Sequence, residues 1–192
     1  MSIIVKEDTR KRILDTALKY IQSKSYNSFS FGDIAKEVGI KKASIHYHFE
    51  SKEILGIAAI KNYKEKIFYL TKKLDKSTEN PWEKLEHYFG FFKSGLKNEY
   101  VCPAAVLSAE INSIPKEMEN ELRTLFDYYM EWLAKILDFG RTIGEFHFRK
   151  TSSEMALFIS SAIEGAMLFA RAYGKPNHYD ITVESIVEML QD

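Results

Sequence analysis

The stretch of sequence that decides the fold is FGDIAKEVGIKKASIHYHF, residues 31 to 49. Its first eight residues predict one short helix, and its last nine predict a second helix after a tight corner. Ala35 is small where the two helices would touch, Gly39 permits the positive φ of a sharp turn, and Ile45 would point inward. This spacing predicts a helix-turn-helix, a motif whose second helix enters the major groove of DNA.

Local signals mark where neighbouring helices begin. Ser30, with Asp33 three residues later, has the pattern of a capping box, and Ser51 precedes a further helix. Upstream, apolar residues recur every three or four positions, which predicts a leading helix from about Asp8 to Ser23. Together these helices predict one small module over residues 1–51.

The size of the chain leaves room for a second, larger domain over residues 52–192. The chain has 192 residues, of which 45% are hydrophobic and 14% aromatic, enough for a substantial core. Its formal net charge is zero, but residues 1–52 carry ten Lys and Arg against six Asp and Glu. Positive charge is therefore concentrated where DNA would bind, although an excess of this size also fits ordinary surface scatter.

The single cysteine, Cys102, provides no disulfide framework and fits a reducing compartment. The opening MSIIVKED lacks the apolar region of a signal peptide, and no apolar run approaches the roughly 20 residues of a membrane span. The sequence therefore predicts a soluble, cytoplasmic protein without membrane association and without a cofactor.

Beyond residue 51 the sequence predicts helices and almost no strand, so the predicted fold class is all-α. The four prolines lie at or near proposed segment boundaries. Residues 138–150, DFGRTIGEFHFRK, contain two glycines and are expected to form a turn. The predicted helices are Lys52–Lys76, Pro81–Asn98, Pro103–Asn112, Pro115–Phe139, Ser152–Tyr173 and Thr182–Leu190.

The last two predicted helices carry apolar stripes suited to contact with other helices. Small residues between Glu154 and Ala172 permit close approach, and the final helix has apolar residues at 1-4-5-8 spacing. Paired with their copies, these helices would form a four-helix dimer interface; alternatively, both close the core of a monomer. The predicted interface residues are Ile159, Ile163, Ala166, Phe169, Val183, Ile186, Val187 and Leu190.

Aromatic residues are abundant in the middle of the chain, which suits an apolar pocket for a flat or lipophilic ligand. Most of them are also expected to be ordinary core residues. Few charges interrupt the aromatic clusters, so a neutral or hydrophobic ligand is favoured. The predicted pocket residues are Tyr88, Phe92, Cys102, Leu107, Phe126, Tyr129 and Trp132. The candidate polar anchors are Glu86, His87, Glu110 and Arg123.

Residues 9–55, TRKRILDTALKYIQSKSYNSFSFGDIAKEVGIKKASIHYHFESKEIL, resemble the DNA-binding domain of the tetracycline-repressor (TetR) family, most strongly over residues 39–55. CPAAVLSAE, residues 102–110, and SAIEGAMLFARA, residues 161–172, more weakly resemble ligand-domain and dimer-helix segments of multidrug-type members. The resemblance implies a homodimeric, all-helical transcriptional regulator, usually a repressor. Such a protein leaves a palindromic operator when a small-molecule effector enters its larger domain.

The resemblance also implies contacts with double-stranded operator DNA, for which hydroxyl, imidazole, ammonium and helix N-terminal N–H groups are suitable donors. The chain departs from the family pattern at Lys41, Ala43 and His46, where Ser, Gly and Tyr are usual, so the operator sequence cannot be borrowed from relatives. Residues at base or nearby phosphate positions are Lys42, Ala43, Ser44 and His46. Residues at backbone-contacting positions are Tyr47, His48 and Lys52, and Ser30 and Phe31 lie at the mouth of the preceding helix.

Other functions fit the same residues less well. His46 and His48 would point to different faces of a helix without a third ligand, so no metal site is predicted. Cys102 has no accompanying catalytic motif, so no enzyme and no catalytic residue are predicted, although a redox-sensing thiol is left open. The main alternative is a helical ligand-binding protein whose N-terminal module docks a protein partner rather than DNA.

Overall fold

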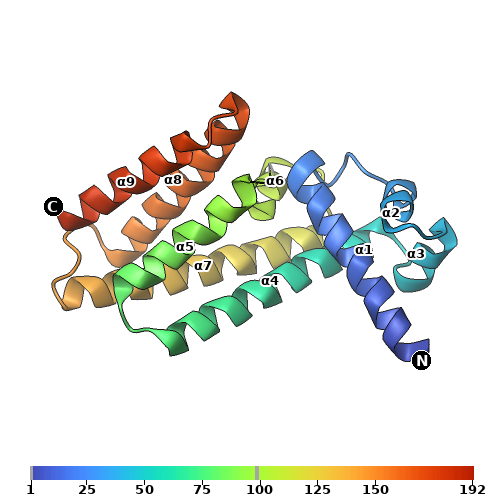
Figure 1. Cartoon of the computed structure of the whole chain (residues 1–192), viewed down its shortest axis with the longest axis horizontal. Helices are drawn as coiled ribbons and strands as arrows, with labels where there is room; N and C mark the ends of the chain where they lie inside the picture. The colour runs from blue at the N-terminus through green and yellow to red at the C-terminus, as the bar shows by residue number, and fades with distance from the viewer. Residues whose placement is uncertain (1, 98–99) are drawn as a thin grey trace. The chain divides into compact units, whose positions relative to one another are not determined.

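The computed structural model describes residues 2–97 and 100–192, with side chains from Asp8 onward. Every regular element in these ranges is a helix, which confirms the predicted all-α fold (Figure 1). The predicted helix end at Asn98 lies outside the described residues. The helices are α1 (Ser2–Lys24), α2 (Phe31–Val38), α3 (Lys42–His48), α4 (Lys52–Ser77), α5 (Pro81–Leu96), α6 (Pro103–Ala109), α7 (Lys116–Thr142), α8 (Ser152–Tyr173) and α9 (Asn177–Gln191).

Three helices are longer than their sequence patterns predict. Helix α1 begins at residue 2 rather than 8, and α9 begins at residue 177 rather than 182. Helix α7 continues through Gly140, where the sequence predicts a turn. A Cβ at this position would overlap the ring of Phe146, so the close packing of this ring requires a glycine. Gly140 is thus a packing glycine within the helix. The chain turns only at Gly144, where φ is 80°.

The described chain divides into two compact units. Unit 1 comprises residues 1–68 and 103–124, and unit 2 comprises residues 69–102 and 125–192. Helices α4 and α7 each continue from one unit into the other. The predicted domain boundary after residue 51 falls in the bend before α4 and does not coincide with a boundary between the two units. The division into a DNA-binding and a ligand-binding domain at this residue stays a prediction.

In unit 1, α2 packs against α1 and α3, and α6 packs against α1 (Figure 1). Ile13, Ala17 and Ile21 recur at four-residue intervals on α1 and have no exposed surface, so they form one apolar stripe. Ile34 from α2 and Ile45 from α3 are also fully buried. One small core therefore holds the three N-terminal helices.

In unit 2, α8 packs against both α5 and α9. Local chemistry sets its ends. The Thr151 hydroxyl accepts a hydrogen bond from the Glu154 N–H at 3.2 Å, and the Glu154 carboxylate accepts one from the Thr151 N–H at 2.9 Å. At the other end Gly174 adopts a left-handed conformation with φ of 61°. A helix of 22 residues is thereby delimited at both ends.

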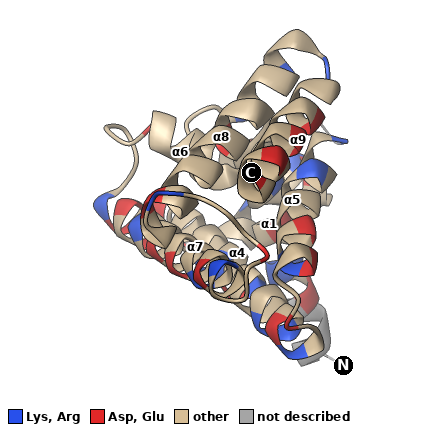
Figure 2. Ribbon diagram, turned by 90° about the vertical axis from the view of Figure 1, so that its left-hand side faces the viewer, with Lys and Arg blue, Asp and Glu red and all other residues tan. Residues whose placement is uncertain are grey.

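Helix α8 is unusually apolar for a helix of this length. Figure 2 shows few charged residues on it, whereas α4 and α7 carry both signs of charge along their length. By length and composition alone α8 could cross a membrane, and 39% of its most apolar window is buried within the fold. This finding corrects the expectation that no apolar run approaches the length of a span. The core helix of a soluble protein passes the same test.

Candidate nucleic-acid interface and buried carboxylate

Helix α2 and the turn after it are fixed by short-range contacts. The Asp33 carboxylate accepts a hydrogen bond from the Ser30 N–H at 2.8 Å, and the Ser30 hydroxyl accepts one from the Asp33 N–H at 3.4 Å. This confirms the predicted capping box. The Ser30 hydroxyl and N–H donate to Asp33 and thereby hold the pKa of its carboxyl below the usual value. Gly39 ends the helix at φ of 73° and donates its N–H to the Ala35 carbonyl, as the predicted corner requires.

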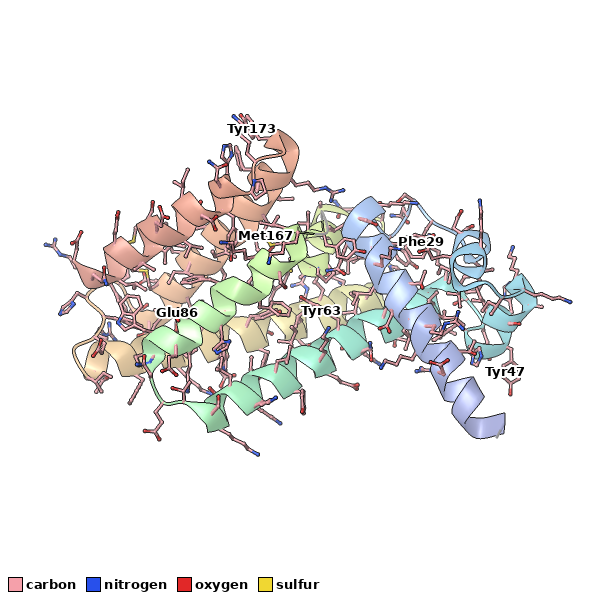
Figure 3. The ribbon with its side chains drawn as sticks, in the orientation of Figure 1. Phe29, Tyr47, Tyr63, Glu86, Met167 and Tyr173 are labelled. Carbon is pink, nitrogen blue, oxygen red and sulfur yellow. The ribbon has the colours of Figure 1, made fainter. Side chains whose placement is uncertain are left out.

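Helix α3 presents one face to the core and another to solvent. Ile45 is fully buried and anchors the helix. The side chains of Lys42, Ala43, His46 and Tyr47 are exposed, and those of Ser44 and His48 are half-buried. Tyr47 is 68% exposed and projects outward from α3 in Figure 3. The helix therefore offers hydroxyl, ammonium and imidazole groups on a single accessible surface.

Two predicted contact residues have roles inside the module. Phe31 is 6% exposed, and its ring meets that of His46 edge-on at a centroid distance of 4.9 Å. It therefore supports the His46 side chain and is not itself presented to a partner. The Lys52 ammonium lies over the rings of Tyr26 and Phe29, at 4.7 and 4.6 Å from their centroids. Partial burial lowers the pKa of Lys52, which is consistent with this position.

Comparison with known proteins relates this chain to bacterial transcriptional regulators. A sequence model described as "Bacterial regulatory proteins, tetR family" matches residues 13–59. The HTH-type transcriptional regulator LmrA of Bacillus subtilis is 29% identical over 171 residues, covering 85% of this chain and 86% of LmrA. IcaR of Staphylococcus aureus, named a negative transcriptional regulator of the biofilm operon icaADBC, is 40% identical over 52 residues. That match covers 27% of this chain and 28% of IcaR.

The crystal structure of a TetR transcriptional regulator from Legionella pneumophila is similar over nearly the whole chain. It has a TM-score of 0.85 and 31% sequence identity, covering 93% of this chain and 95% of that one. The chain belongs to the TetR family. It is therefore a DNA-binding transcriptional regulator with an N-terminal helix-turn-helix, and its family is one of regulators rather than enzymes.

In this TetR-family chain, α8 and α9 pack against each other within unit 2. Ile159, Ile163, Ile186 and Leu190 are at most 2% exposed, so these predicted interface residues pack in the core of their own unit. Ala166 is also buried, Val183 and Val187 are half-buried, and Phe169 is 59% exposed. The other large apolar side chains exposed on these helices are Leu157, Phe158, Leu168, Tyr173, Ile181 and Met189.

The predicted pocket residues are divided between the units. Leu107 lies in unit 1, and the other six lie in unit 2, where Phe126 is half-buried and Cys102 is buried. Ring centroids lie 5.0 Å apart for Tyr88 and Phe92, 6.2 Å for Phe92 and Tyr129, and 6.3 Å for Tyr88 and Trp132. These four residues, Tyr88, Phe92, Tyr129 and Trp132, are called the aromatic cluster below.

A carboxylate that the sequence analysis did not select lies beside this cluster. Glu164, on α8, has an oxygen, Oε2, that is buried and has no hydrogen-bond partner. Burial raises the pKa of Glu164 to about 7, and a hydrogen bond from the Cys102 thiol opposes that rise. The sequence signal was available, because Glu164 is the one charged residue between Glu154 and Arg171 on an otherwise apolar helix.

The candidate polar anchors are engaged elsewhere or exposed. The Glu110 carboxylate accepts hydrogen bonds from the Tyr26 N–H at 2.8 Å and from the Asn27 side-chain amide at 3.0 Å, which ties the end of α6 to the loop before α2. Arg123 pairs with a glutamate one turn earlier on α7. Glu86 and His87 are exposed on α5. None of these four therefore combines burial with an unsatisfied polar atom.

Two surface hollows border α9 in unit 2, each of about 510 Å³. Neither is lined by a residue of the predicted pocket. The hollow between α5 and α9 is lined mainly by Trp82, Glu86, Phe89, Lys93, Tyr179 and Val183. The hollow between α8 and α9 is lined by Ala162, Gly165, Ala166, Phe169, His178, Ile181 and Thr182.

Proposed function

We propose that this TetR-family regulator is a homodimeric repressor that binds a palindromic operator through α3 and is released by a small effector held in unit 2. The observation that carries the proposal is the exposed polar face of α3, on a helix fixed by the Gly39 corner and the buried Ile45. The Staphylococcus relative, a negative regulator by name, supports repression. We also propose that the protein is cytoplasmic, as operator binding requires.

The proposed DNA contacts are assigned from the exposure of the side chains on and near α3. Tyr47 and Lys42 are exposed and can donate to phosphate oxygens, whereas Ala43 is small enough for α3 to approach the bases closely. His46, held by Phe31, is the candidate for a base-edge contact. Lys52 contributes positive charge near the phosphates while its ammonium rests on aromatic rings.

Two copies of α3 must lie about 34 to 36 Å apart to enter successive major grooves, so repression by this route requires a dimer. The exposed apolar side chains of α8 and α9, with the hollow between these helices, form the proposed interface. The Phe169 and Tyr173 rings stack with 11° between their planes and present a flat apolar surface there. Burying such a surface against its copy is favourable.

Effector control follows from linkage. The dimer has one arrangement that binds the operator and one that does not. A small, lipophilic or aromatic molecule that prefers the second arrangement weakens operator binding by the ratio of its affinities for the two arrangements. The rival function, docking of a protein partner by the N-terminal module, predicts no DNA affinity that depends on salt.

The test is binding of the purified protein to DNA upstream of its own gene, measured by fluorescence anisotropy over a salt series, with a scrambled duplex as control. Preferential binding that weakens as salt rises is expected. Tyr47→Ala is expected to weaken binding about tenfold without changing the dimer. Tyr69→Ala, which removes a tyrosine that is 67% exposed on α4, is the matched control and should bind like the wild type.

Two results would redirect the proposal. If the protein binds neither duplex at low salt, and mass spectrometry finds no small molecule bound to it, the protein-docking function takes precedence. If Tyr47→Ala and Tyr69→Ala weaken binding equally, the surface that contacts DNA is not that of α3.

A further inference from the structure

Glu164 is a charged group in a place where a charge is expensive. It lies in the middle of the most apolar helix of the chain, and its Oε2 atom is buried without a hydrogen-bond partner. A buried carboxylate is normally paired with a cation or with several donors, and leaving it unpaired is strongly unfavourable. A native group of this kind calls for an explanation, and a bound ligand is one.

The neighbours of Glu164 do not supply what Oε2 lacks. The Tyr88 hydroxyl is already hydrogen-bonded to the Ser160 hydroxyl at 3.1 Å. The Tyr179 hydroxyl donates to the Phe89 carbonyl at 2.8 Å. The Cys102 thiol, a weak donor, is hydrogen-bonded to the carboxylate. Among the residues the structure describes, no Lys or Arg forms an ion pair with Glu164.

The aromatic cluster lies next to this carboxylate. Ser160 and Glu164 are four residues apart on α8 and therefore share one face of the helix. The hydrogen bond between the Tyr88 and Ser160 hydroxyls joins that face to the cluster. The negative faces of aromatic rings attract cations, and Trp and Tyr do so most strongly.

We propose that Glu164 is the anionic anchor of the effector site and that the effector is an organic cation with a flat apolar body. This inference rests on the proposed function in one respect, that unit 2 holds an effector. An ammonium group would satisfy Oε2 and restore charge balance, while an aromatic body would contact the rings of Tyr88 and Trp132. This cationic effector takes the place of the neutral or hydrophobic ligand that the scarcity of charges in the sequence favours.

Three probes of one shape separate the possible ligand classes: 1-naphthylmethylammonium, neutral 1-naphthalenemethanol and anionic 1-naphthoate. Each is titrated into the full-length protein at pH 8 by calorimetry, without DNA. The ammonium is expected to bind at least about tenfold more tightly than the alcohol, and the carboxylate more weakly than both. Glu164→Gln keeps the size of the side chain and should abolish the preference for the cation. Glu65→Gln, at an exposed carboxylate on α4 that lines neither hollow, should leave it unchanged.

A second measurement needs no variant. Because burial places the pKa of Glu164 at about 7, the affinity of wild-type protein for the ammonium probe should fall as pH is lowered from 8 to 5.5. The proposal is overturned if the ammonium does not bind, binds no better than the alcohol, or keeps its advantage in Glu164→Gln. Operator binding of Glu164→Gln without probe should equal that of the wild type, so a failure of DNA binding is read separately from a failure of the anchor.

Discussion

The most quantitative expectation concerns the effect of Glu164 on stability as a function of pH. Burial raises the pKa of this carboxyl from 4.5 to about 7 in the folded protein, against the opposing hydrogen bond from Cys102. In the unfolded chain the group is solvated, so the folded state holds the proton more tightly. The stabilisation that protonated Glu164 gives to the folded state is complete below pH 4.5 and is lost as the pH rises through about 7.

The magnitude follows from the two pKa values. The full difference corresponds to about 3 kcal/mol, at roughly 1.4 kcal/mol per pKa unit. Between pH 5 and pH 8 the wild type should lose about 2.5 kcal/mol through this group alone. Glu164→Gln is uncharged throughout, so its free energy of unfolding relative to the wild type should rise by that amount over the same interval.

Urea unfolding followed by far-UV circular dichroism, at one fixed protein concentration, measures this difference at each pH. Other carboxyls, such as Asp33 and Glu121, have lowered pKa values and affect both proteins alike. Subtracting the two curves therefore isolates Glu164. Glu65→Gln controls for the change from carboxylate to amide at an exposed site. A difference that is constant with pH, or larger at pH 5 than at pH 8, would refute the reasoning.

Three further outcomes are expected. Gly140→Ala should lower the free energy of unfolding by about 1 to 3 kcal/mol, because the added methyl overlaps the Phe146 ring; unchanged urea unfolding would contradict this. Glu110→Gln weakens the acceptor for the Tyr26 N–H, so that amide should exchange its hydrogen faster, and equal protection by NMR would argue against the link between α6 and the loop before α2. Phe169→Glu places a charge in the proposed interface and should yield a monomer by sedimentation, with a persistent dimer as the contrary result.

The helix-turn-helix could be predicted because its determinants are local. Ser30, Asp33 and Gly39 act through neighbours within a few positions of the sequence, and Ile45 is buried as its apolar character predicts. The all-helical fold followed for a similar reason, since prolines and apolar spacing mark helices without knowledge of their partners.

The remaining features depend on contacts between distant residues. Gly140 looks like a helix breaker until the Phe146 ring is seen to fill the space of its missing side chain. An apolar stripe on α8 fits a dimer interface and an internal core equally well, and only burial shows that Ile163 serves the core. The lone charge at Glu164 is visible in the sequence, but the burial of its Oε2 atom without a partner depends on the packing around α8.

The division of the chain into units has a practical consequence for recombining regulators. The unit that contains the helix-turn-helix also includes residues 103–124, so it is discontinuous in sequence. A chimera made by cutting at residue 51 would leave Glu110 with the recipient protein while the loop it binds travelled with the donor. Exchange of operator specificity between relatives should therefore succeed more often when residues 103–124 are transplanted together with residues 1–68.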